Sequence, residues 1–169
     1  MMRNMYSHLD MSKVKDRALW CSYLITFYCL FRKSNSVPKS MSQVNLRRTL
    51  LRRHIKVTKD FVYVHCTFPK TIQFGQRDLV IPIPSNSDPV LGPVRHLNAL
   101  YSTVNCPLDA PAFSYGPSLF ISHSSFTSQL KKLLKLSGYE PALYSRHSFR
   151  RGGASPLYKL GHQFSKSSR

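Results

Sequence analysis

The chain has 169 residues, of which 42% are hydrophobic, so it is long enough for about one domain and can bury a core. Lysine and arginine number 25 against 7 acidic residues, which gives a formal net charge of +18. This composition excludes a wholly disordered chain. The excess charge indicates a polyanionic partner, with nucleic acid as the first candidate and an anionic membrane surface as the second.

The first predicted element is a long, largely buried helix over residues 14–33. Its apolar side chains recur at three-to-four spacing, at Leu19, Tyr23, Phe27, Leu30 and Phe31. The apolar run over residues 18–31 is too short to cross a bilayer, so we expect no membrane span. Pro38 then blocks continuation of the helix.

A β-hairpin is predicted in the middle of the chain. Residues 44–51 favour a short strand that leads into a dense basic run. Residues 61–67 are rich in β-branched and aromatic side chains and predict a second strand. Residues 78–83 predict the returning strand, so that residues 60–84 form a hairpin with Lys70 near its connection.

Helices dominate the second half of the chain. A helix is expected within residues 89–104, beginning after Pro93, and a connecting loop over residues 105–119. Residues 126–136 predict an amphipathic helix, and residues 145–160 a last one. The order of elements predicts an α+β fold that is mainly helical with a small antiparallel β-sheet.

The four cysteines are Cys21, Cys29, Cys66 and Cys106, and none of them forms a CxxC pair. This spacing suggests neither a disulfide framework nor a zinc site. A reducing, intracellular compartment fits best.

Basic residues gather in two runs, which we interpret as candidate DNA contacts. The first run holds Arg47, Arg48, Arg52 and Arg53, followed by His54, Lys56 and Lys59. The second run holds Lys131, Lys132 and Lys135. Most charge runs are simply solvated faces, so this alternative stays open for both runs.

The strongest local string covers residues 144–155, YSRHSFRRGGAS, and contains His147 and Arg150. On a helix, residues three apart lie on one face. Arginine can donate two parallel hydrogen bonds to phosphate oxygens, and histidine can donate another or move a proton. Taken alone, this pair also fits a basic helix start with a satisfied histidine.

Three strings in one order carry a more specific resemblance. They are R-x-S-N-x-x-P at residues 32–38, K-T-x-Q at residues 70–73 and H-S-x-R-R-G-G-A at residues 147–154. Together they resemble the catalytic domain of the tyrosine recombinase (phage integrase) family, closest to the branch found in eukaryotic mobile elements of the Crypton and DIRS kinds. The resemblance covers roughly residues 14–161 and implies a tyrosine recombinase catalytic core over residues 17–161.

The resemblance implies a role for each matched residue. Arg32 matches the first catalytic arginine, Lys70 the catalytic lysine on the hairpin, and His147 and Arg150 the H-x-x-R pair, with Arg151 as a supporting contact. In this family a tyrosine attacks a DNA phosphodiester, the arginines stabilise charge on the non-bridging oxygens, and the lysine can protonate the leaving oxygen. The implied partner is double-stranded DNA, the implied process is DNA recombination and integration, and the implied location is the nucleus. No metal and no cofactor is required.

The resemblance stops short at both ends. In the family the nucleophilic tyrosine follows the H-x-x-R helix after a turn and a further helix, whereas the only later tyrosine here is Tyr158, eight residues after Arg150. Residues 162–169 are interpreted as a divergent polar tail and residues 1–16 as the remnant of an interdomain linker. We therefore expect an incomplete catalytic core that binds DNA without cleaving it, with weakened self-association.

Two other functions remain open. One is a non-catalytic DNA-binding or interaction module derived from a mobile-element recombinase, which would bind DNA with the same sensitivity to salt. The other is a basic RNA-binding protein of ribosomal type, although no RNA-binding string of the RNP kind is visible.

Overall fold

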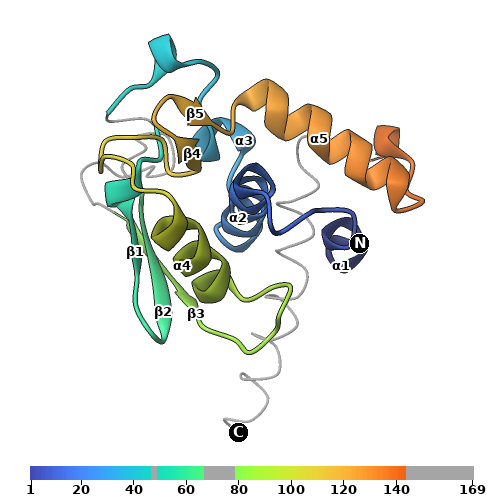
Figure 1. Cartoon of the computed structure of the whole chain (residues 1–169), viewed down its shortest axis with the longest axis horizontal. Helices are drawn as coiled ribbons and strands as arrows, with labels where there is room; N and C mark the ends of the chain where they lie inside the picture. The colour runs from blue at the N-terminus through green and yellow to red at the C-terminus, as the bar shows by residue number, and fades with distance from the viewer. Residues whose placement is uncertain (47–48, 67–78, 144–169) are drawn as a thin grey trace, which may run out of the picture.

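The computed structural model describes residues 1–46, 49–66 and 79–143, and within these ranges the fold is α+β (Figure 1). The helices are α1 (Met2–Tyr6), α2 (Val14–Tyr28), α3 (Lys33–Ser36), α4 (Pro93–Thr103) and α5 (His123–Leu136). The strands are β1 (Ile55–Val57), β2 (Phe61–Cys66), β3 (Leu79–Pro84), β4 (Ser114–Gly116) and β5 (Leu119–Phe120). Short 3-10 turns are η1 (Met41–Gln43), η2 (Arg52–His54) and η3 (Pro141–Leu143).

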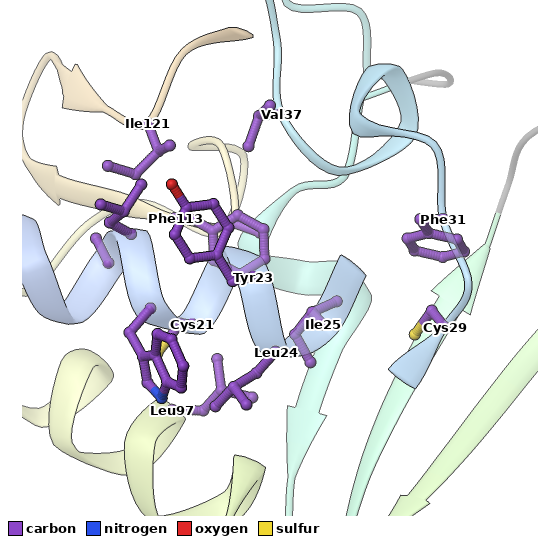
Figure 2. Close-up of a cluster of buried hydrophobic side chains, with 14 of the residues drawn as sticks. Cys21, Tyr23, Leu24, Ile25, Cys29, Phe31, Val37, Leu97, Phe113 and Ile121 are labelled. Atoms are coloured by element: carbon purple, nitrogen blue, oxygen red, sulfur yellow. The ribbon is translucent and has the colours of Figure 1, made fainter. Parts of the chain in front are cut away.

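Helix α2 runs through the centre of the core (Figure 1). Every residue from 18 to 26 is buried, because this stretch is apolar on all sides of the helix. The few polar groups that it buries find partners: the Trp20 Nε1 donates to the Val90 carbonyl at 2.9 Å, and the Tyr23 hydroxyl donates to the Phe126 carbonyl at 3.0 Å. Figure 2 shows the surrounding cluster, in which Leu97 of α4 and Phe113 lie around the central helix.

The predicted hairpin is confirmed for the strands that the structure describes. Strands β2 and β3 pair antiparallel, with Val62 opposite Ile83, and β1 pairs with the other side of β2. The side chains of Val62, Val64 and Cys66 are buried on the inner face, on which α4 packs. The connection at residues 67–78, including Lys70, lies outside the described residues.

Several boundaries differ from the sequence-based expectations. Helix α2 ends at Tyr28 rather than near residue 33. The described residues within the expected strand at 44–51 form no strand beyond an isolated bridge between Leu51 and Pro111, and β1 begins only at Ile55. The loop expected over residues 105–119 contains β4, which pairs with β5. Helix α5 begins three residues early, because the Ser122 hydroxyl caps it by accepting the Ser125 N–H at 3.2 Å. The helix expected over residues 145–160 lies outside the described residues.

The N-terminal segment is part of the core instead of the expected polar linker. Helix α1 buries Met5 completely, and the Tyr6 ring meets the Trp20 ring edge-on with centroids 5.1 Å apart. All four cysteines are buried and free. None of the helices in the described ranges has both the length and the apolarity needed to cross a bilayer.

Candidate nucleic-acid interface

Arg32 lies on the surface directly after a tightly closed helix end. The Phe31 N–H donates to the Thr26 carbonyl at 3.0 Å, and the Leu30 N–H donates to the Phe27 carbonyl at 3.2 Å. These two bonds form a Schellman motif, with Leu30 in the left-handed region at φ 53° where glycine is usual. The motif ends α2, buries Phe31 and leaves the side chain of Arg32 exposed.

The string at residues 32–38 is held at its middle and at its far end. The buried hydroxyls of Ser36 and Thr26 lie 2.8 Å apart. The Pro38 carbonyl accepts the His123 N–H at 2.9 Å, which ties the string to the start of α5. The backbone of this string is therefore held by α2 and α5, while the side chain of Arg32 is exposed to solvent.

The other predicted catalytic residues fall elsewhere in the chain. Lys70, His147 and Arg150 lie outside the described residues, as does the supporting Arg151. The structure therefore gives surroundings for Arg32 but not for these partners. The first two arginines of the basic run, Arg47 and Arg48, also lie outside the described ranges.

Arg52 was predicted as a DNA contact, and the structure contradicts this prediction because its side chain is 7% exposed. Its Nη1 donates to the Val104 carbonyl at 2.7 Å and its Nη2 to the Ser114 carbonyl at 3.4 Å. The guanidinium also lies over the Tyr101 ring, 4.4 Å from the centroid. Arg52 thus joins the end of α4 to β4 from inside the protein.

Arg53 points the other way and remains available at the surface in part. It forms an ion pair with Asp109, which offsets some of its charge. Its neighbour His54 is buried, and the His54 Nδ1 accepts the Leu51 N–H at 3.2 Å. Burial, together with the adjacent Arg53 charge, lowers the pKa of His54, so this imidazole is held neutral and adds no charge to the surface.

The second basic run lies on the surface, where a DNA contact has to be. Helix α5 buries Phe126, Leu133 and Leu134 against the core. Lys131 and Lys132 lie on its exposed side, where Lys135 is also exposed one turn beyond Lys131.

Little of the positive charge is neutralised within the part of the chain described. Three ion pairs occur there: Arg3 with Asp88, Lys13 with Asp10, and Arg53 with Asp109. Exposed cations without a carboxylate partner give a surface that attracts polyanions.

The sequence-based reasoning missed the outer face of the sheet. Phe61 and Tyr63 alternate with buried valines, so both rings point away from the core. Their ring centroids lie 5.7 Å apart at an interplanar angle of 33°. The alternation itself was readable in the FVYVHC string, but only the structure shows that this face is open.

Comparison of the chain with models of protein families, with curated proteins and with solved structures gives no match. The structure shows an α+β chain with exposed cations at Arg32 and on α5.

Proposed function

We propose that the chain is a DNA-binding protein built on a tyrosine recombinase catalytic core, in which Arg32, Lys70, His147 and Arg150 hold one backbone phosphate. The ordered match of the three strings supports the family. The observation that carries the proposal is the placement of Arg32, exposed on a backbone that the Schellman motif and Pro38 fix in place. The excess of basic over acidic residues supports the DNA partner.

The contrast between Arg32 and a surface lysine gives the first test. Arg32→Ala should weaken binding to duplex DNA more than Lys131→Ala, because an arginine can donate to two phosphate oxygens at once. Each change should also lower the slope of log affinity against log salt by about one if the residue contacts a phosphate. Fluorescence anisotropy over a range of salt concentrations measures both quantities.

The outcomes separate the two DNA-binding functions. Equal losses for Arg32→Ala and Lys131→Ala would favour the non-catalytic module, in which no phosphate pocket exists. Binding that does not fall with salt, or no binding to DNA, would contradict the proposal as a whole.

A double-mutant cycle tests whether two arginines share a phosphate. If Arg32 and Arg150 hold the same group, the losses from Arg32→Ala and Arg150→Ala should not add, with a coupling energy of about 0.5–3 kcal/mol. The same cycle with Lys131→Ala in place of Arg150→Ala serves as the control and should be additive. Additivity in both cycles would count against a common pocket.

The 169-residue polypeptide should form no covalent link to DNA, because no tyrosine stands at the family's nucleophile position within it. A nicked duplex that traps recombinase intermediates, followed by a denaturing gel, measures this directly. A retained protein–DNA band that disappears in Tyr158→Phe would overturn the expectation and identify the nucleophile.

A further inference from the structure

The outer face of the three-stranded sheet presents a continuous set of side chains. On β2, Phe61, Tyr63 and His65 alternate with the buried residues and so point outward. The strand register places further outward residues beside them: Lys56 of β1 and Pro82 of β3 lie opposite Tyr63, Pro84 lies opposite Phe61, and Val80 lies opposite His65.

This face is largely exposed to solvent although much of it is apolar. Phe61 is 36% exposed and Val80 is 39% exposed, Lys56, Pro82 and Pro84 are exposed as well, and Tyr63 and His65 are half-buried. The opposite face of the sheet packs on α4, as Figure 1 shows. Contiguous patches of exposed apolar side chains on soluble proteins mark interaction sites, whereas single exposed apolar residues are common.

The two aromatic rings are arranged to receive planar partners. At 5.7 Å between centroids and 33° between planes, Phe61 and Tyr63 lie beside each other instead of covering one another. Each ring can therefore stack one planar group. Neighbouring aromatics on a sheet bind unpaired nucleobases in this way, since every base has a π-face.

The charge beside the rings and the net charge of the chain indicate the class of partner. Lys56 lies beside Tyr63, where it can meet a sugar-phosphate backbone. The turn that joins β1 to β2 carries one exposed cation and one exposed anion, Lys59 and Asp60. The whole chain carries +18, which repels basic partners and attracts polyanions. Pro82 and Pro84 have no N–H, and proline on an edge strand disfavours addition of another strand.

We propose that this face binds single-stranded nucleic acid, with unpaired bases stacked on Phe61 and Tyr63 and the phosphates near Lys56. The nucleic-acid class of the partner rests on the proposed function, whereas the stacking contact is an additional property of the sheet. It gives the chain a stacking contact for unpaired bases in addition to the phosphate contact at Arg32.

The test compares ligands that differ only in their bases. Fluorescence anisotropy is measured with an oligodeoxythymidylate, with an abasic strand of equal length and with a duplex. The double variant Phe61→Ala with Tyr63→Ala should lose roughly 5- to 150-fold in affinity for the oligodeoxythymidylate for each of the two stacked bases, and little for the abasic strand or the duplex. Tyr63→Phe keeps the ring and should bind nearly as well as the unchanged chain.

Leu119→Ala is the matched control, because Leu119 is an exposed apolar residue (53%) on the other sheet. It should leave all three affinities unchanged. Urea unfolding of each variant verifies that the fold is kept, since Phe61 and Leu119 are exposed whereas Tyr63 is half-buried.

Each outcome decides the inference. Equal affinity of the unchanged chain for the thymidylate and abasic strands, or an unchanged affinity in the double variant, would overturn it while leaving duplex binding and the proposed function intact. If the unchanged chain bound none of the three ligands, this result would instead contradict the proposed function. Binding of a proline-rich decapeptide that the double variant loses, without any base-dependent binding, would assign the face to a peptide and also overturn the inference.

Discussion

Arg32 and Arg52 are both arginines in polar, basic stretches, yet the structure uses them in opposite ways. Arg32 follows a helix end whose hydrogen bonds turn the backbone outward, so its guanidinium lies in solvent. Arg52 begins a 3-10 turn that directs its side chain inward, where carbonyls and the Tyr101 ring replace water. The backbone turn, and not the local charge density, therefore decides whether a cation can contact an external phosphate.

The largest expected effect comes from removing the buried arginine. Arg52→Ala leaves the carbonyls of Val104 and Ser114 without their donor and removes the cation over Tyr101, which should lower the free energy of unfolding by about 3 kcal/mol. Urea unfolding followed by circular dichroism measures the change.

Arg32→Ala is the matched control and should change the free energy of unfolding by no more than about 0.5 kcal/mol, because its side chain is exposed. If both variants lost the same stability, the division into one structural and one surface arginine would be wrong.

The fixed turn before Arg32 can be strained by one isomeric change. Leu30→Ile keeps the composition of the side chain but adds a β-branch, which disfavours the positive φ at this position. We expect a loss of about 1–2 kcal/mol in the free energy of unfolding. Leu30→Met, which is unbranched at Cβ, should lose less; equal losses would show that packing rather than backbone conformation sets the requirement.

The smallest expected change in stability concerns His54, which lies in the same 3-10 turn as Arg52. Because its folded-state pKa is lowered, the neutral form is favoured in the folded protein, and the unfolded chain binds the proton more readily. The contribution of His54 to stability is therefore complete above its unfolded pKa of about 6.5 and declines as the pH falls below that value.

Urea unfolding of the unchanged chain and of His54→Gln at several pH values measures this contribution. The fall in stability below the unfolded pKa should be smaller in His54→Gln than in the unchanged chain. An identical pH profile in His54→Gln would mean that this imidazole does not titrate on folding.

The sequence predicted the elements with strong local signals. The β-branched and aromatic run gave β2, and the apolar spacing gave α2 and α5. The end of α2 was missed because Leu30 occupies a position where glycine would have marked the turn. The burial of Arg52 depends on Val104 and Ser114, more than fifty residues away, and no local pattern reports such a contact.

The candidate site was predictable to a similar degree. The strings predicted a catalytic role for Arg32, and the second basic run predicted DNA contacts at Lys131 and Lys132; these roles stay predictions, and the structure adds that the three side chains are exposed. The aromatic face was not predicted, because alternation shows that two rings share a side of a strand but not whether that side is covered.

Because all four thiols are buried, their alkylation reports unfolding of the chain. Burial raises the pKa of Cys66 to about 11 and raises that of Cys29 as well, so in the folded protein these sulfurs are protonated and shielded from alkylating reagents. Incorporation of a maleimide over time, followed by mass spectrometry, would then count opening events of the core without any added label. The buried cysteines, which are unreactive in the folded state, thus report directly how often the core opens.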